Sequence, residues 1–155
     1  MRRVDRSALV PYSARDMFLL VADVEAYPSF LPWCREVEVH LREGHIVEAT
    51  LELHVGRISR RFRTRNTMTP HERMDLALMG GPFRHLAGGW GFRQLGDQGS
   101  KVSLNMDFEF DSRALDLVIG RYFEDICNRL VDAFTQRAMV VYGEPHAREI
   151  GHDQR

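Results

Sequence analysis

The chain has 155 residues, of which 44% are hydrophobic and 28% are charged, and its formal net charge is −1. This length and composition fit one globular domain that buries a substantial core without disulfides or metal ions. The near-zero net charge argues against a polyanionic partner such as DNA for the surface as a whole, so any basic site has to be local.

The cysteines and the first residues bear on the compartment. Cys34 and Cys127 lie far apart and form no CxxC pair, which argues against a disulfide scaffold, a zinc site or redox chemistry. No apolar region follows the basic start at residues 1–4, so we do not expect this start to be a signal peptide. No run approaches the ~18 apolar residues that span a bilayer. We expect a soluble, cytoplasmic protein, with peripheral attachment to the inner membrane as an open alternative.

A short strand and a short helix are the first expected elements. Residues 3–10 can form the strand. Ser13 followed by Asp16 resembles a capping box, and apolar residues then recur at helical spacing. Because proline follows Tyr27 and disfavours helix in the residue before it, the helix ends by that position. The stretch 23–34 mixes prolines with large apolar residues and is expected to be a compact loop.

From residue 37 onward the hydrophobic period changes to two, which is typical of strands. Glycine-containing turns are expected to separate these runs. In the last run the even-numbered residues are apolar and the odd-numbered ones are polar. The pattern predicts an antiparallel meander of about six strands with one solvated face. The runs are 37–41, 49–55, 58–65, 74–79, 84–95 and 101–110.

One long helix is expected after the last strand. Asp111 and Ser112 are good N-terminal caps, and Gly143 is expected to end the helix. Gly120 can interrupt its first turns, because a glycine inside a helix costs about 1 kcal/mol. Residues 144–155 are polar and are expected to form a flexible tail. The apolar stripe of the helix consists of Ile119, Phe123, Ile126, Leu130, Phe134 and Val141.

These elements can bury their apolar faces together in one obvious way. A curved antiparallel sheet wraps around the long C-terminal helix, which is an α+β, helix-grip arrangement. We expect a single domain at residues 1–143.

Four segments carry a family resemblance: VADVEAYPSFLPWC at 21–34, GGPFRHLAGGW at 80–90, MDFEF at 106–110 and AFTQRAMVVYG at 133–143. In this order they resemble the coenzyme Q-binding START-domain family, which shares its sequence group with the ribosome-association toxin family in the START-like, polyketide cyclase/dehydrase superfamily. The resemblance runs from about residue 3 to 143 and implies a helix-grip fold with a lipid-sized cavity.

The two branches imply different functions. The quinone branch implies a carrier or chaperone that holds a polyprenyl quinone (ubiquinone) or a similar lipid and supports respiratory electron transport, with no other cofactor. The toxin branch implies binding to the large ribosomal subunit and blocking of subunit joining. The ending Pro32-Trp33-Cys34 looks like the pattern shared by both branches, so it does not separate them.

An apolar and aromatic set is expected to converge between sheet and helix and to hold the ligand, although residue by residue these side chains can simply be core. Burying one CH₂ contributes about 0.8 kcal/mol, so an isoprene unit contributes roughly 3–4 kcal/mol. The loop 27–34 is expected to close one end of the cavity as a lid or to contact a membrane surface. The set is Phe30, Pro32, Trp33, Phe62, Phe83, Trp90, Phe92, Met106, Phe108, Tyr122, Phe123 and Ile126.

A basic face is expected on one strand, with about 6.6–7 Å between alternate residues. This spacing resembles the phosphate repeat of nucleic acid, so rRNA is one hypothetical partner and anionic lipid head groups are another. The alternative is a solvated face whose charges are balanced by Glu48 and Glu52 on the preceding strand. The face consists of Arg57, Arg61, Arg63 and Arg65.

No catalytic constellation emerges from the sequence. HERMD at 71–75 lacks the second histidine of HExxH, and GxSxG, P-loop and GxGxxG motifs are missing. Gly88-Gly89 favours a bulge or turn over a phosphate cradle. We expect a binding protein rather than an enzyme, and no metal site.

Overall fold

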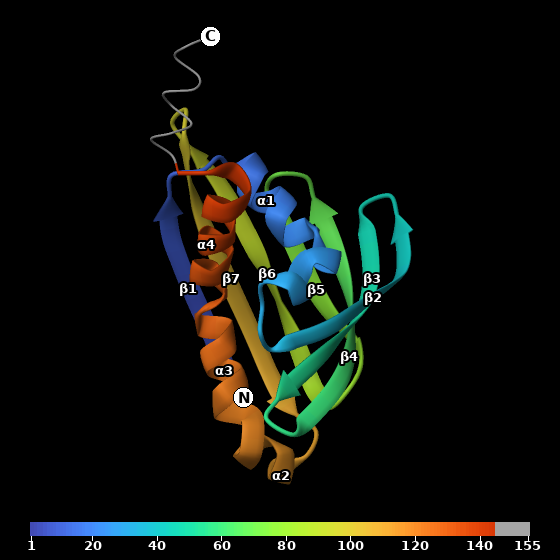
Figure 1. The fold of residues 1–155 in the computed structure, drawn as a ribbon. Coiled ribbons are helices and arrows are strands. Elements are labelled where there is room, and N and C mark those ends of the chain that lie inside the picture. The colour runs from blue at the N-terminus through green and yellow to red at the C-terminus, as the bar shows by residue number, and fades with distance from the viewer. Residues whose placement is uncertain (145–155) are drawn as a thin grey trace.

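The computed structural model of the chain describes residues 1–144. Seven strands form one antiparallel sheet in the order β1-β7-β6-β5-β4-β3-β2, which curves around the helices (Figure 1). The expected first strand and six-stranded meander are thereby confirmed, as is the α+β helix-grip fold. The strands are β1 (Arg2–Val10), β2 (Cys34–Glu43), β3 (Ile46–Val55), β4 (Ile58–Thr69), β5 (Arg73–Gly80), β6 (Phe83–Leu95) and β7 (Gly99–Phe110).

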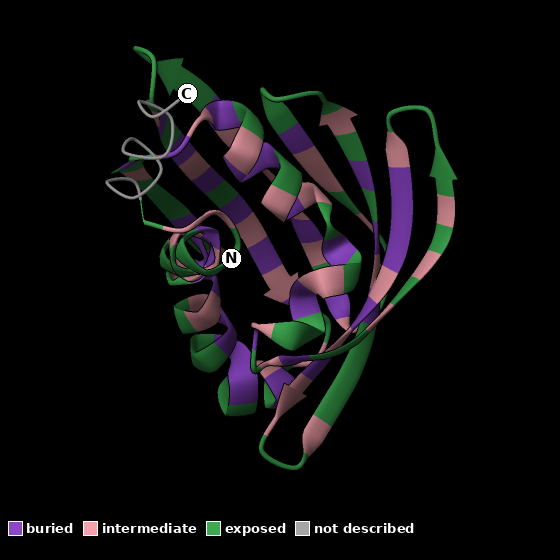
Figure 2. Cartoon of the chain, turned by 45° about the horizontal axis from the view of Figure 1, so that its top comes forward, coloured by how far each residue is buried: buried purple, intermediate pink, exposed green. Residues whose placement is uncertain are grey.

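Alternating burial fixes which strand face meets the core (Figure 2). In β7 the even-numbered residues from Val102 to Phe110 are buried, and the odd-numbered residues between them are not. The tight connections at Gly44 and Gly56 have φ near +60°, a backbone conformation that glycine adopts without strain. The period of two therefore sets the core face, and the glycines set the hairpins.

Gly88 allows β6 and β7 to approach closely. A Cβ at this position would lie 2.1 Å from the backbone oxygen of Asn105. Gly88 pairs in register with Met106, and Gly89 with Asn105, inside a continuous ladder. The expected bulge or turn at Gly88-Gly89 is therefore wrong, because these glycines serve strand contact.

The N-terminal helix α1 (Ala14–Ala22) begins as the sequence predicts. The hydroxyl of Ser13 accepts a hydrogen bond from the backbone N–H of Asp16 at 3.0 Å. A 3₁₀ helix, η1 (Val24–Ser29), follows and contains Pro28. The expectation of a compact loop at 23–34 is corrected to this helical turn followed by a short connection to β2.

The C-terminal helix is not one continuous element, which corrects the expectation. It consists of α2 (Arg113–Leu115), the π-helical turn η2 (Asp116–Gly120), α3 (Arg121–Asn128) and α4 (Leu130–Tyr142). The backbone leaves α-helical geometry at Arg129, with φ −103° and ψ −2°. As expected, Gly143 ends the helix, with φ +81° and its N–H bonded to the carbonyl of Met139.

The buried stripe of this helical stretch holds as far as Phe134. Val141, expected in the stripe, is 48% exposed, because Ala138 and Tyr142 continue the inward face at helical spacing. The tail expected from residue 144 lies, apart from Glu144 itself, outside the described residues. Within the described part of the chain, no helix is long and apolar enough to cross a membrane.

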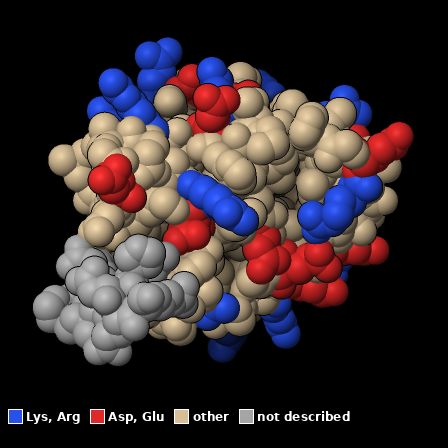
Figure 3. Space-filling view, turned by 90° about the horizontal axis from the view of Figure 1, so that it is seen from above, with Lys and Arg blue, Asp and Glu red and all other residues tan. Residues whose placement is uncertain are grey.

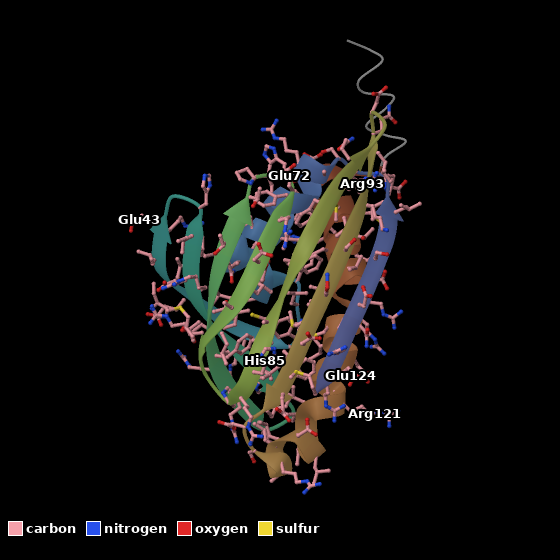
Figure 4. The ribbon with its side chains drawn as sticks, turned by 180° about the vertical axis from the view of Figure 1, so that it is seen from behind. Glu43, Glu72, His85, Arg93, Arg121 and Glu124 are labelled. Atoms are coloured by element: carbon pink, nitrogen blue, oxygen red, sulfur yellow. The ribbon has the colours of Figure 1, made fainter. Side chains whose placement is uncertain are left out.

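Helices cover only the concave face of the sheet. α3 and α4 lie along β1, while α1 lies against β6 and β7 (Figure 1). Seen from behind, the convex face of the sheet carries side chains and no helix of the described chain (Figure 4). The core, and any internal site, therefore lies between the concave face and the helices.

Candidate functional site

A small apolar cavity lies between the concave face of the sheet and α3–α4. Its volume is about 70 Å³. Segments far apart in the sequence form its wall: η1 and the connection after it, five strands, and α3 with α4. The lining residues are Val24, Tyr27, Leu31, Trp33, Leu51, Phe62, Thr64, Asn66, Met74, Leu76, Leu86, Trp90, Met106, Phe123, Ile126, Cys127, Leu130 and Phe134.

The volume decides what the cavity can hold as it stands. One water molecule occupies about 30 Å³ of the liquid, and sites for drug-sized ligands measure roughly 300–1,000 Å³. The space is thus mostly filled by its own lining, which corrects the lipid-sized cavity implied by the family resemblance. An isoprenoid can be admitted only if lining side chains move apart.

Half of the apolar set expected from the sequence lines this cavity. These residues come from the connection before β2, from β4, β6 and β7, and from α3. Both tryptophans of the chain are among them. The six residues are Trp33, Phe62, Trp90, Met106, Phe123 and Ile126.

Three aromatic residues of the set pack behind the wall instead. Phe83 stacks on Phe110 with ring centroids 4.6 Å apart, and Phe108 meets Phe123 edge-on at 4.9 Å. Phe92 lies between Phe18 and Trp90. The expectation that Phe83, Phe92 and Phe108 face the cavity is corrected, because neighbouring rings surround them.

Phe30, Pro32 and Tyr122 also lie outside the lining. Phe30 is half-buried against Tyr27 and Phe134, with the guanidinium of Arg137 4.9 Å from its ring centroid. Pro32 is exposed, and Tyr122 is 51% exposed on α3. The neighbours Leu31 and Trp33 do line the cavity, so this connection packs over one end of it.

Sequence reasoning missed the polar part of the wall. Thr64 and Asn66 are 5% and 3% exposed, and the Thr64 hydroxyl donates a hydrogen bond to Asn66 Oδ1 at 2.9 Å. The available signal was the alternation along β4, because both residues share the inward parity of Phe62. The alternation places Thr64 on the inward face with Phe62, but the polarity of Thr64 and Asn66 kept both out of the expected ligand-binding set.

The ionisable groups near the cavity stay protonated. Burial raises the pKa of the Cys34 and Cys127 thiols to about 12. Burial also raises the pKa of Tyr27, whose hydroxyl donates a hydrogen bond to the carbonyl of Val21. The interpretation of Cys34 as a buried small hydrophobe is consistent with its 2% exposure.

The arginine face is neutralised by glutamates. Arg63 and Arg65 both contact the carboxylate of Glu48, at 2.9 and 2.8 Å. These contacts, Arg65 foremost, hold the pKa of Glu48 below its ordinary value. Arg61 lies 3.5 Å from Glu52, and it also contacts Glu36 on β2. The alternative of charges balanced by the preceding strand is therefore confirmed.

Arg57 does not belong to that face. It lies in the turn before β4, because the β3–β4 hairpin closes between Val55 and Ile58. Arg57 and Arg60 are exposed, and neither forms an ion pair within the described residues. On the face seen from above, basic and acidic side chains are interspersed (Figure 3).

The remaining sequence candidates form no reactive centre. His71 lies in the β4–β5 turn with φ +65°, and its ring meets Phe18 edge-on. Across residues 1–144, no group of three His, Cys, Asp or Glu side chains is placed to hold a metal ion.

Comparison with known proteins places this architecture among relatives. The profile of a family described as polyketide cyclase / dehydrase and lipid transport matches residues 10–135. A Vibrio cholerae protein named ribosome association toxin RatA is 43% identical over 145 residues, which make up 93% of this chain and 100% of the relative. The Xenopus laevis mitochondrial coenzyme Q-binding protein COQ10 homolog B is 28% identical, covering 88% of this chain and 58% of its own. These relatives confirm the resemblance seen in the four sequence segments.

Solved structures agree on the fold. A Thermus thermophilus protein superposes with a TM-score of 0.76 at 17% identity, covering 90% of this chain and 98% of its own. The Zhui aromatase/cyclase from a Streptomyces species gives a TM-score of 0.71 at 19% identity, covering 90% and 95%. At such identities the likeness concerns the fold alone.

Proposed function

The chain belongs to the polyketide cyclase / dehydrase and lipid transport family, and on that premise we propose that it binds a polyprenyl quinone or a similar lipid between the sheet and α3–α4. It then acts as a carrier or chaperone that supports respiratory electron transport. The observation that carries this proposal is the cavity wall, which consists of aliphatic, aromatic and sulfur-containing side chains except at Thr64 and Asn66. The name of the Xenopus relative supports the quinone as ligand.

The energetics suit a carrier. Burial of two isoprene units contributes about 6–8 kcal/mol, which corresponds to a Kd of roughly 1–40 μM before the cost of opening the cavity. Because only molecules with an open cavity bind, the apparent Kd is the intrinsic Kd divided by the fraction of molecules that are open. Because a bilayer offers the tail a similar apolar environment, uptake and release are nearly balanced.

The connection from η1 to Trp33 is the part proposed to open. Leu31 and Trp33 supply lining side chains, and Phe30 rests on Phe134 of α4. The backbone hydrogen bonds found for residues 30–32 run to neighbours within the same segment, and Trp33 adds one bond to the sheet, where its carbonyl accepts from the N–H of His54 at 2.8 Å. Outward movement of these residues therefore breaks few bonds to the sheet, whereas movement of a strand breaks a ladder.

The wall supports binding rather than catalysis. General acid–base catalysis needs groups that titrate near the working pH. The ionisable lining groups are Tyr27 and Cys127, and burial raises the pKa of both. Neither is poised to exchange a proton at neutral pH.

A fluorescence titration tests the proposal, because Trp33 and Trp90 both line the cavity. A quinone with a short prenyl tail quenches nearby indoles, and the expected quenching saturates at one quinone per chain. Leu76→Phe with Ile126→Phe fills the cavity and is expected to weaken binding about tenfold or more. Tyr122→Ala, on the exposed side of α3, serves as the control and keeps wild-type binding. Linear, non-saturating quenching that is equal in all three proteins contradicts the proposal.

Ribosome association is a second candidate. Here the favouring observation is 43% identity over the whole length of the Vibrio toxin, against 28% to the quinone-binding relative. We propose in this case that the protein binds the large ribosomal subunit and blocks subunit joining. Arginines with no ion pair are the better candidates for phosphate contact than those bound to glutamate.

Co-sedimentation with purified large subunits tests this candidate. Arg57→Gln with Arg60→Gln removes charges that lie outside the Glu48–Glu52 network and is expected to weaken binding. Binding is also expected to weaken steeply with salt, since each phosphate contact releases a counterion. Arg61→Gln with Arg63→Gln is the matched pair inside the network, with a smaller effect. Co-sedimentation that is indifferent to both salt and these variants contradicts a phosphate-contacting surface.

A further inference from the structure

Thr64 and Asn66 form a polar pair inside an otherwise apolar wall. They occupy successive inward positions of β4 in the cavity wall to which α3 and α4 also contribute. Their exposed fractions are 5% for Thr64 and 3% for Asn66. Their neighbours in the ladders are apolar: Asn66 pairs with Val47 on β3 and with Leu76 on β5. Nothing in this part of the core requires an amide for packing.

One hydrogen bond joins the two side chains, and the amide nitrogen of Asn66 takes no part in it. Thr64 Oγ1 donates to Asn66 Oδ1 at 2.9 Å. Within residues 1–144 no hydrogen bond of the Asn66 Nδ2 group is found, and Asn66 lines the cavity. Because the oxygen of this lining residue already accepts from threonine, the amide nitrogen is the group left to bond a ligand in the cavity.

A ligand that fills the cavity would cut this donor off from water, and a donor left without an acceptor then costs about 1–3 kcal/mol. A ligand carbonyl oxygen removes this cost by accepting the bond. A neutral donor in a wall without charged groups favours a neutral acceptor and disfavours a carboxylate, a phosphate or an ammonium group, whose charge would stay unpaired.

We infer that Asn66, held by the Thr64 hydroxyl, anchors a carbonyl oxygen of the ligand's head group. The inference rests on the proposed lipid-binding function and narrows its ligand class to prenyl-type lipids with a neutral carbonyl head, such as a quinone. Asn66 contacts the ligand, and Thr64 is a positioning residue that fixes the rotamer of the amide.

The test compares two probes that share one tail. Protein is incubated with phosphatidylcholine vesicles that contain either a short-tailed ubiquinone or the matching prenylbenzene without ring oxygens. Bound lipid is then extracted from the separated protein and quantified. Asn66→Leu removes the donor at similar volume, Thr64→Val removes the hydroxyl, and Thr67→Val on the outer face of the same strand is the control.

The wild type is expected to prefer the quinone over the prenylbenzene by about tenfold, the range of one hydrogen bond. Asn66→Leu abolishes the preference by losing quinone and keeping prenylbenzene, and Thr64→Val reduces it. The carbonyl stretching frequency of bound quinone, lowered by the hydrogen bond, rises in Asn66→Leu and stays unchanged in Thr67→Val. This spectroscopic signature separates anchoring from a structural role.

The possible results distinguish failure of lipid binding from failure of the Asn66 anchor. If the wild type takes up neither probe, the lipid-binding function itself is wrong. If it takes up both, and Asn66→Leu retains the wild-type preference and carbonyl frequency, lipid binding stands and the Asn66 anchor is overturned. Should Asn66→Leu fail to fold, Thr64→Val carries the test, with an unchanged preference counting against the anchor.

Discussion

The guanidinium of Arg2 and the carboxylate of Asp116 form two parallel hydrogen bonds, Nε to Oδ1 at 3.0 Å and Nη2 to Oδ2 at 3.2 Å. A third bond joins Arg2 Nη1 to Glu124 of α3 at 2.9 Å. These contacts hold the pKa of Asp116 below its ordinary value. They tie the π-helical turn to the edge strand, on the side of the helical cover away from the η1–Trp33 connection that we propose to open.

Arg2→Met is therefore expected to lower the free energy of unfolding by about 1–2 kcal/mol, since a bidentate, partly exposed pair exceeds the usual surface ion pair. Arg3→Met is the control, because Arg3 is 80% exposed and lies 3.5 Å from Asp107. Urea denaturation of both variants makes the measurement. If Arg2→Met and Arg3→Met have equal free energies of unfolding, the Arg2 contacts do not stabilise the fold.

Gly88→Ala is expected to destabilise the protein by at least about 2 kcal/mol, because the new methyl group meets backbone rather than a flexible side chain. Gly91→Ala in the same strand is the matched variant, since its Cβ would meet nothing closer than Ser103 Cβ at 3.9 Å. Thermal unfolding compares the two. A Gly88→Ala protein as stable as Gly91→Ala contradicts the close approach of β6 and β7.

Glu48→Gln is expected to destabilise the sheet at neutral pH by removing the shared partner of Arg63 and Arg65. The pKa of Glu48 is lowered in the folded state, so its charge stabilises the fold above the ordinary value of 4.5. That stabilisation is lost as the pH falls below this value and through the folded-state pKa. Denaturation at a series of pH values should therefore show wild type and variant converging in acid. A constant difference at all pH values argues against the ion pairs.

Thiol labelling reports on cavity opening, because Cys127 lines the cavity and its thiol has a pKa of about 12. In a Cys34→Ser background, alkylation of Cys127 is expected to be slow near neutral pH and to slow further when a short-tailed quinone is bound. The rate is followed by mass spectrometry. Faster labelling with ligand, or no change at saturation, contradicts occupancy of this cavity.

The fold could be predicted from the sequence because its signals are local and periodic. The alternation in β7 and the cap at Ser13 each decide an element from neighbouring residues. The break at Arg129 was beyond such reasoning, since no glycine or proline marks it. Tyr122 was misplaced for a related reason. The sequence does not show whether the buried stripe of the helix includes Tyr122 or has its edge at Phe123. That depends on how the helix is rotated about its axis relative to the sheet.

The cavity wall was only half predictable. Size and hydrophobicity select Trp33, Phe62 and Trp90, but they also select Phe83 and Phe108, which other rings surround. The same criteria excluded Asn66, although it lines the cavity. A polar residue is assigned to the surface unless its inward position in the strand alternation is given priority. The pairing of the arginines with Glu48 was foreseeable, since the register of a short hairpin follows from its turn.

The most direct test of lipid binding is native mass spectrometry of the protein isolated from cells that make prenyl quinones. The account predicts a fraction of chains carrying one added mass that matches a prenyl quinone, strongly reduced when Leu76 and Ile126 are both replaced by Phe. Bare protein only, in the wild type as in that variant, and no uptake from quinone-loaded vesicles, would contradict it.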